Sequence, residues 1–320
     1  MTDAGGNGAA RGTSDRSAGP ALSVVVLSHN RAELLRRTLV SVFAQDPGAR
    51  EVIVVDNGSR DGSPEMVARE FPAAVLLRFD ENLGIRARNE GFRKAQGELI
   101  LSLDDDIELM NPECLRDVSA RFQGDPQLGA LSLKICDPGT GNEYSSSHWW
   151  HPLPRETHQH HEFATDHLSE AAVMFRAAAL RSAGYYYEAL FWGGEEWDLA
   201  LGMIDSGYLL RYFPEPVLHL APRGSLIHAA SPRHALLIRN RCWIAFRRLP
   251  ILQALAFTLP RIVLWAARAA RFGYLGHYLR GIGGLFVAAP RIIRDRKPVS
   301  RNALRTLRQI QRQPKVERQP

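Results

Sequence analysis

Cysteine is scarce in this sequence, and its amino-terminal residues contain no apolar run. The 320 residues include only Cys114, Cys136 and Cys242, which are too few and too scattered for a disulfide framework or a thiolate zinc site. Residues 1–20 are rich in Gly, Ala, Ser and Asp and lack the hydrophobic core of a signal peptide. We therefore expect a disordered tail over residues 1–20 and a protein that works in a reducing, cytoplasmic compartment.

Acidic residues are nearly missing from the last quarter of the chain. Residues 233–320 hold 19 Lys and Arg against only Asp295 and Glu317, so this stretch carries +17 and residues 1–232 carry −11, within a net charge of +6. Such a basic end suits an anionic partner, with lipid headgroups favoured over nucleic acid. We expect no nucleic-acid partner.

Long uncharged hydrophobic runs are also missing. Apolar residues are dense between Ile251 and Pro290, but arginines interrupt them before any uncharged run reaches the ~18 residues of a spanning helix. The sequence predicts a helical region over 231–292 that does not cross a bilayer, followed by a basic tail over 293–320. Two interpretations stay open: helices lying in the headgroup region of an anionic membrane, or ordinary helices packed on the rest of the protein.

The chain does have the composition of a globular protein and a regular alternation of strands and helices. Hydrophobic residues make up 45%, and the mean hydropathy is −0.21, both typical of a folded soluble domain. Apolar runs predict strands, and residues with helical spacing follow each run. The strands are expected at 22–27, 51–56, 74–79 and 98–103, and the helices at 31–45, 63–71, 85–96 and after Asn111. This alternation predicts an α/β fold with a parallel sheet covered on both faces.

The pattern changes after residues 127–135. Residues 137–167 are too many for a plain connector and contain Trp149 and Trp150. They also contain six of the eleven histidines, namely His148, His151, His158, His160, His161 and His167. No pair of these histidines has the helical spacing and supporting acid of a zinc site, so we interpret the segment as an acceptor-side loop. A helix over 195–206, a strand over 209–220 and two or three helices over 231–290 complete the prediction.

Three consecutive carboxylates, Asp104 to Asp106, follow the strand at 98–103. The carboxyl edge of an open α/β sheet is where ligands bind. If the chain stays extended, Asp104 and Asp106 lie on one side and Asp105 on the other. Like charges so close repel each other, and a divalent cation relieves the repulsion. A solvated acidic loop is the alternative interpretation.

Seven short motifs, in order along the chain, resemble those of the family 2 glycosyltransferases. They are Val26-Leu-Ser-His-Asn-Arg31, Val54-Val-Asp-Asn-Gly-Ser59, Asn82-Leu-Gly84 with Ala87-Arg-Asn89, Leu103-Asp-Asp-Asp106, Trp192-Gly-Gly-Glu-Glu-Trp-Asp-Leu199, Pro214 to His219, and Arg239-Asn240. The resemblance runs from about Leu22 to Arg248. It implies a GT-A fold, a Rossmann-like mixed sheet with helices on both faces, over about 21–230, with the C-terminal helices as an extension.

The same resemblance implies a set of residues that bind a nucleoside diphosphate sugar. The set is His29, Arg31, Asp56, Gly84, Arg88, Asp104 and Asp105. Asp56 would bind the nucleotide base, although an Asx turn before Gly58 would explain it as well. Arg86 and Arg88 can present guanidinium groups to a diphosphate, whereas Arg93 and Lys94 are better explained as a solvated helix face.

The resemblance also implies a metal site and a catalytic base. Asp104, Asp106 and His219 would bind Mn²⁺ or Mg²⁺, which suit oxygen ligands with one imidazole better than zinc does. Glu196 would be the base. The family usually has Glu-Asp here, whereas this chain has Glu195-Glu196, so the choice between Glu195 and Glu196 stays open.

The expected function is metal-dependent, inverting transfer of a sugar from a nucleoside diphosphate sugar to a hydroxyl acceptor, a glycan, a lipid-linked molecule or a small molecule. A nucleotidyltransferase is the first alternative, but Ser28-His-Asn-Arg31 lacks the glycines of its phosphate loop. A second is an inactive scaffold that binds membrane or nucleic acid, which predicts the loss of acidic site residues that are present here. The expected location is cytoplasmic, with attachment to the cytoplasmic face of a membrane as an open option.

Overall fold

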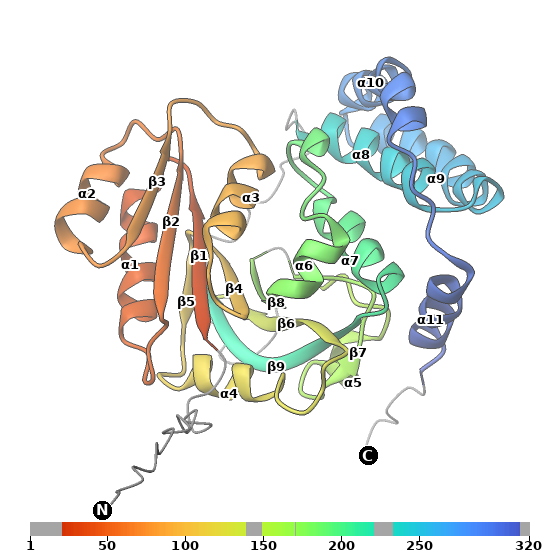
Figure 1. Cartoon of the computed structure of the whole chain (residues 1–320). Coiled ribbons are helices and arrows are strands. Elements are labelled where there is room, and N and C mark those ends of the chain that lie inside the picture. Colours follow the sequence, from red (N-terminus) through yellow and green to blue (C-terminus); the bar gives the residue numbers. More distant parts are fainter. Residues whose placement is uncertain (1–20, 139–148, 170, 221–232, 314–320) are drawn as a thin grey trace, which may run out of the picture.

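The computed structural model describes residues 21–138, 149–169, 171–220 and 233–313. The predicted disordered tail over 1–20 lies outside the described residues, as do His148 and the last residues of the predicted basic tail. Within the described residues a mixed α/β domain carries a set of C-terminal helices on one side (Figure 1).

The first half of the chain forms the parallel part of the sheet. The strands are β1 (Leu22–Ser28), β2 (Glu51–Asn57), β3 (Val75–Phe79) and β4 (Leu99–Asp104), in the order β3-β2-β1-β4. All three pairings are parallel, as the alternation predicts, because helical crossovers join neighbouring strands. The helices between them are α1 (Ala32–Phe43), α2 (Ser63–Glu70) and α3 (Ile85–Lys94). This order brings the ends of β1, β2 and β4 to one edge.

The second half extends the sheet in mixed orientation. Its strands are β5 (Ile107–Leu109), β6 (Leu128–Cys136), β7 (Phe163–Ala164), β8 (Ala172–Arg176) and β9 (Leu209–His219). The order continues β4-β8-β6-β9-β5, and β8 is antiparallel to both β4 and β6. The sequence pattern does not predict β5, β7 or β8, which have three, two and five residues. The sheet is therefore mixed, as the family resemblance implies.

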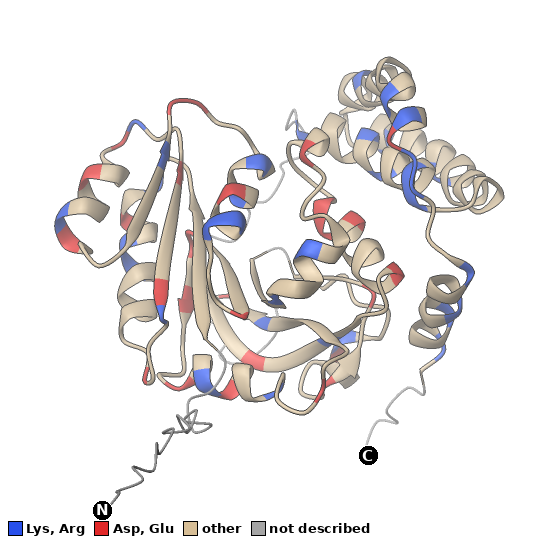
Figure 2. Cartoon of the chain, viewed as in Figure 1, with Lys and Arg blue, Asp and Glu red and all other residues tan. Residues whose placement is uncertain are grey.

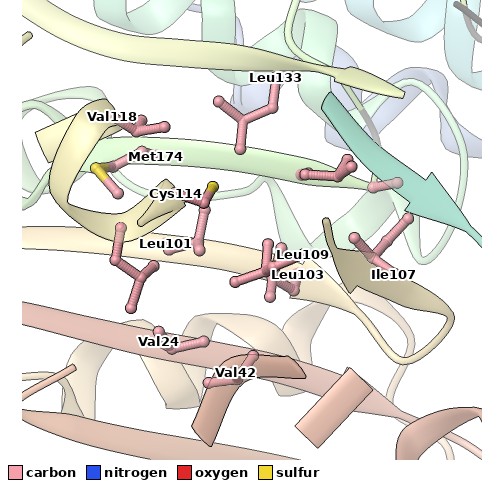
Figure 3. Packing of buried hydrophobic residues seen from close by; sticks show 14 of the residues in the cluster. Val24, Val42, Leu101, Leu103, Ile107, Leu109, Cys114, Val118, Leu133 and Met174 are labelled. Atoms are coloured by element: carbon pink, nitrogen blue, oxygen red, sulfur yellow. The ribbon is translucent and has the colours of Figure 1, made fainter. Parts of the chain in front are cut away.

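Two hydrophobic cores cover the two faces of the sheet. Alternate residues of β1 face opposite ways: Val24 and Val26 belong to one core and Val25 to the other. The first core packs under α1, α2 and α4 (Cys114–Ala120), and Figure 3 shows Val24, Leu101 and Cys114 within it. The second core packs under α3, α6 (Ala177–Ala183) and α7 (Glu195–Asp205). The short helices α5 (Arg155–His158) and η1 (Glu188–Leu190) lie in the connections.

The C-terminal helices are α8 (Arg233–Arg248), α9 (Ile251–Arg271), α10 (Leu275–Arg294) and α11 (Arg301–Gln311). The sequence pattern predicts a tail after 293, whereas α11 packs Leu307 and Ile310 into the second core. One helix of the described chain, α9, is long and apolar enough by length and composition to cross a membrane, with a mean hydropathy of 1.3. The arginines within α9 therefore do not by themselves exclude a span, and the expectation that this region does not cross a bilayer stays a prediction.

Candidate active site

The candidate site is a cleft of about 350 Å³ at the carboxyl-terminal edge of the parallel strands, where open α/β sheets bind ligands. Eight of the eleven predicted residues line it: His29, Arg31, Gly84, Arg88, Asp104, Asp105, Glu195 and Glu196. The other three, Asp56, Asp106 and His219, lie outside this lining. The opposite wall comes from the loop before α7 and from the start of α8, through Phe191, Trp192 and Arg233.

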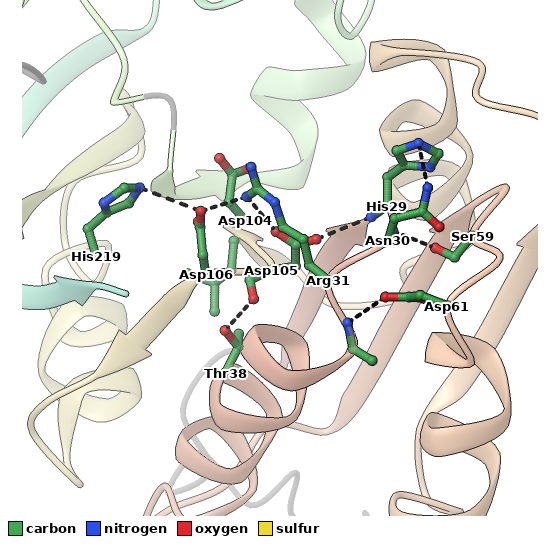
Figure 4. Close-up of polar contacts among 12 residues, drawn as sticks. His29, Asn30, Arg31, Thr38, Ser59, Asp61, Asp104, Asp105, Asp106 and His219 are labelled. Atoms are coloured by element: carbon green, nitrogen blue, oxygen red, sulfur yellow. Dashed lines mark hydrogen bonds and ion pairs between the residues drawn. The ribbon is translucent and has the colours of Figure 1, made fainter. Parts of the chain in front are cut away.

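Arg31 joins two of the three consecutive carboxylates. Its Nη1 donates to Asp105 Oδ1 at 3.1 Å and to Asp106 Oδ2 at 2.6 Å (Figure 4). The chain does not stay extended after Asp104, so the alternation that would place Asp104 and Asp106 together on one side does not apply. Strand β4 ends at Asp104 and a turn follows, which directs Asp105 and Asp106 to the same guanidinium group.

Burial sets the electrostatics of this pair. It raises the pKa of Asp105 to about 6, against the opposing effect of Arg31. Burial, together with the nearby charge of Asp104, also raises the pKa of Asp106 to about 6. The environment therefore disfavours the charged form of both carboxylates. A cation that binds them would stabilise that charged form, and this gain would add to its affinity.

His219 lies beside this pair at the end of β9. Its Nε2 is 3.5 Å from Asp106 Oδ2 (Figure 4), because β9 pairs with β5 and sets His219 opposite Ile107. Burial lowers the pKa of His219, which favours the neutral imidazole that a metal requires. Asp106 Oδ1 is buried and accepts no hydrogen bond from the described residues.

Asp104 contacts a different arginine. Arg88, on α3 and almost fully buried, pairs with Asp104 Oδ1 and donates to Ser102 Oγ at 2.7 Å. The carboxylates of Asp104 and Glu196 help to raise the pKa of Arg88, against the opposing effect of burial. In the described part of the chain no three His, Cys, Asp or Glu side chains are grouped as a metal site. Of the predicted metal ligands, Asp106 and His219 are in direct contact. Asp104 pairs with Arg88, but its charge acts on both of them.

The neighbouring Arg86 behaves differently. Its Nε lies 3.7 Å from Glu188 Oε2, and its side chain is 58% exposed. Arg93 donates to the same glutamate at 2.9 Å. Arg86 and Arg93 thus belong to one solvated ion-pair face on α3, and only Arg88 reaches into the cleft.

The loops after β1 and β2 are held together by hydrogen bonds to backbone groups. Asp56 is buried, and its Oδ2 accepts the Ser59 amide at 3.3 Å, which forms the turn that sequence reasoning left open. Asp56 Oδ1 accepts no hydrogen bond from the described residues, so one buried oxygen remains for a ligand. His29 Nδ1 donates to Asn57 O at 2.9 Å, and its backbone amide donates to Asp105 Oδ2 at 3.2 Å. Through these two hydrogen bonds, His29 links the end of β1 to β2 and to Asp105.

Gly84 allows a close approach that another residue would prevent. Its φ is +60°, and a Cβ there would lie 2.3 Å from Phe191 O. The Ile85 amide donates to that same oxygen at 2.8 Å. Phe191 itself has a φ of +65°, which is strained for an aromatic residue. The loop that precedes α7 is thus fixed against the start of α3 at the cleft.

The acidic pair Glu195 and Glu196 begins α7, and both side chains are less than 10% exposed. Asn240, on α8, holds the preceding loop by donating its Nδ2 to the carbonyls of Trp192 and Gly193, each at 2.8 Å. Further along α7, Asp198 is fully buried between Arg247 and Arg248. Asn240 belongs to a motif recognised in the sequence, but its hydrogen bonds to this loop are not predictable from it. The sequence also does not predict that Phe191 and Arg233 line the cleft.

The histidine-rich segment contributes to packing where it is described. His151 and Trp149 pack on Phe163 and Tyr212, and burial lowers the pKa of His151 to about 3. Trp149 is therefore partly buried and packs against the first core. Trp150 is 43% exposed and lies under the guanidinium group of Arg241.

Known proteins are similar to this chain in sequence and in architecture. The family profile described as glycosyl transferase family 2 matches residues 23–182. An N-acetylglucosaminyl-diphospho-decaprenol L-rhamnosyltransferase of Mycobacterium tuberculosis is 26% identical over 62% of this chain and 75% of its own. Three other curated relatives match over shorter segments. The matched segments make up 37%, 29% and 31% of the lengths of these relatives, so the chain spans about a third of each.

Solved structures show the same fold. The mannosyltransferase PcManGT of Pyrobaculum calidifontis, in complex with GDP-Man and Mn²⁺, has a TM-score of 0.53 and 21% identity over 91% of this chain and 79% of its own. S. aureus TarS 1–349, in complex with UDP-GlcNAc, has a TM-score of 0.57 and 19% identity over 86% of this chain and 83% of its own. The fold is thus the GT-A glycosyltransferase fold, and the chain belongs to glycosyl transferase family 2.

Proposed function

We propose that this glycosyltransferase moves a sugar, with inversion and with a divalent metal ion, from a nucleoside diphosphate sugar to a hydroxyl acceptor. One observation carries the proposal. The carboxylates at the end of β4 and those at the start of α7 line one cleft, so the first group could bind a metal and the diphosphate while the second accepts the acceptor proton. The GDP-Man, UDP-GlcNAc and Mn²⁺ named with the similar structures support this donor class.

The residues present fit a metal in part. Asp106 and His219 are 3.5 Å apart, close to the roughly 3 Å that separates adjacent ligands of one ion with bonds of about 2.1 Å. The buried Asp106 Oδ1 is a further oxygen available to a cation. Asp104 would complete the set by turning from Arg88. Mn²⁺ or Mg²⁺ bound here would neutralise charge on the departing diphosphate.

This chain's own residues would do the rest. Glu196, or Glu195 if the register differs by one, would take the acceptor proton while the acceptor oxygen attacks the anomeric carbon. Arg88, Arg31 and His29 would orient the donor beside Asp104 and Asp105, and Asp56 would bind the base through its remaining oxygen. Inversion follows if the transfer is a single displacement.

The acceptor is proposed as a class only. The M. tuberculosis relative is named for a diphospho-decaprenol substrate, so a lipid-linked hydroxyl acceptor is one member of the class for this chain, beside glycans and small molecules. A cytoplasmic location at the membrane periphery belongs to the same proposal.

A thermal-shift panel of UDP-, dTDP- and GDP-sugars, with and without Mn²⁺, tests the donor assignment. A donor at a hundred times its dissociation constant adds about 2.7 kcal/mol to the free energy of unfolding. We expect one nucleotide to stabilise the wild type with Mn²⁺ and to do so much less in Asp106→Ala. If no sugar nucleotide stabilises the protein with Mn²⁺ or Mg²⁺, the donor assignment is wrong.

A further inference from the structure

Two C-terminal helices expose apolar side chains in continuous stripes. On α9 the stripe contains Leu252 (77% exposed), Leu259 and Val263 (69%), spaced seven and four residues apart. On α10 it contains Leu275, Leu279, Phe286 and Val287 (84%). Spacings of four and seven place Leu252, Leu259 and Val263 on one side of α9 and Leu275, Leu279 and Phe286 on one side of α10. Val287 lies next to Phe286. We call the two stripes together the C-terminal apolar face.

The face is bordered by arginines and by almost no acids. Arg268 and Arg271 lie at the end of α9, and Arg280 lies within α10, all exposed. Between residues 233 and 313 the sequence has a single acid, Asp295. Figure 2 shows the same contrast: the C-terminal helices are blue and tan with almost no red, whereas the sheet domain carries both colours. The face thus combines apolar surface with one sign of charge.

Contacts on the inner side hold α9 against the protein along its length. The ring of Phe257 packs on Trp197 of the catalytic helix α7, at a centroid distance of 5.2 Å. In its middle, Ile262 O accepts a hydrogen bond from the Tyr278 hydroxyl of α10 at 3.1 Å. Near its end, Ala269 is fully buried in a small core with Tyr274. A helix that crossed the membrane would lose these contacts, so this geometry suits a helix that lies along a surface.

We propose that the C-terminal apolar face docks on an anionic lipid bilayer, with the leucines, valines and Phe286 entering the headgroup region. An apolar stripe bordered by arginines is the arrangement that interfacial helices use on anionic membranes. A second copy of the chain fits less well. It would bring its own arginines to the same face, and the single acid of residues 233–313, Asp295, already pairs with Arg291 and Arg294.

Docking through this face would also fix the active site relative to the membrane. Helix α8 packs against α10 and α9, and its first residue, Arg233, lines the catalytic cleft. Asn240 on the same helix holds the loop before Glu195. The element that supports the face is therefore the one that shapes the cleft wall.

Flotation of the full-length protein with vesicles tests the proposal without any sugar donor, so its result is independent of the proposed reaction. We expect binding to phosphatidylglycerol-containing vesicles and much weaker binding to pure phosphatidylcholine vesicles. Val263→Asp with Val287→Asp should abolish binding, because a charge in each stripe opposes insertion. Val40→Asp is the matched control, since Val40 is 57% exposed on α1 and should bind as wild type does.

A second variant tests the charge. Arg268→Gln, Arg271→Gln and Arg280→Gln together should weaken vesicle binding by about five-fold per arginine, equivalent to about 1 kcal/mol each. Arg60→Gln with Arg181→Gln, which are exposed elsewhere, should have little effect. Absence of wild-type binding, or equal binding by the valine variant, would overturn the proposal. A wild-type dimer in light scattering that the valine variant converts to monomer, without vesicle binding, would assign the face to a second copy instead.

Discussion

Arg31 Nη1 lies 2.6 Å from Asp106 Oδ2, the same oxygen that is 3.5 Å from His219 Nε2. The guanidinium group therefore supplies positive charge where the proposed metal ion would bind. Arg31 Nη1 also donates to Asp105 Oδ1 at 3.1 Å. Arg31 and a divalent cation would compete for the same carboxylates. Substitution of Arg31 therefore separates the stabilisation that comes from the arginine from the stabilisation that comes from the metal ion.

Arg31→Gln should lower stability in EDTA by about 1–2 kcal/mol, because two buried carboxylates lose their charged partner. Mn²⁺ should then raise the melting temperature of the variant more than that of the wild type. Arg37→Gln is the control, since its ion pair with Glu108 is half exposed and is worth about 0–1 kcal/mol. Equal Mn²⁺ shifts in the variant and wild type would argue against a metal at these carboxylates.

The raised pKa of Asp106, about 6, predicts a specific pH dependence. Between the unfolded-state pKa of about 3.9 and the folded value, the native state keeps a proton that the unfolded state has lost. The contribution of Asp106 to stability therefore falls as pH rises through this window and is constant above it. In EDTA, the unfolding free energy of wild type minus that of Asp106→Asn should fall by about 1–3 kcal/mol from pH 4 to pH 7. Urea unfolding measures it, and a difference that rises with pH would show that the pKa is lowered.

Glu196→Gln should reduce kcat by about 10²–10⁴ while donor affinity stays nearly constant, because glutamine keeps the size of the side chain but cannot accept the proton. Glu195→Gln should have a smaller effect. Steady-state kinetics with a soluble acceptor and a separate donor titration give the two quantities. The reverse order would make Glu195 the base, and wild-type turnover in both variants would remove this pair from the mechanism.

Asn240→Ala should reduce kcat although Asn240 does not line the cleft. Its amide holds the carbonyls of Trp192 and Gly193, and their release frees the loop that positions Glu195 and Glu196. We expect kcat to fall about ten-fold or more, since small displacements of catalytic groups are costly, with donor affinity changed much less. The exposed Asn302, on α11, provides a control as Asn302→Ala. A variant that changes stability without changing kcat would make Asn240 purely structural.

Much of this architecture is predictable from local patterns. The apolar runs of β1, β2 and β4 and the helices after them predict the parallel half of the sheet, and the acids after β4 predict a ligand edge. The antiparallel half depends on β8, whose pairing with β4 is a tertiary contact between residues about seventy positions apart. Helix α11 has three buried apolar residues among arginines, and only its contact with the second core shows its role.

The site residues divide in the same way. His29, Arg88 and Glu196 lie in recognisable motifs, and the structure places all three at the cleft. The pairing of their charges was not predictable, because the turn after Asp104 decides which carboxylate meets Arg31 and which meets Arg88. The contact of Phe191 with the start of α3 is not predictable from the sequence. It depends on a positive φ and on a backbone oxygen, and neither can be recognised from the type of residue.

The most direct test of the central claim is release of the nucleoside diphosphate from the donor selected in the thermal-shift panel. The rate is measured for wild type and Asp106→Ala, each with Mn²⁺ and with excess EDTA. The account predicts release by the wild type with Mn²⁺ alone, and loss of that release in the variant to the level seen with EDTA. Equal rates for the wild type with Mn²⁺ and with EDTA would contradict it.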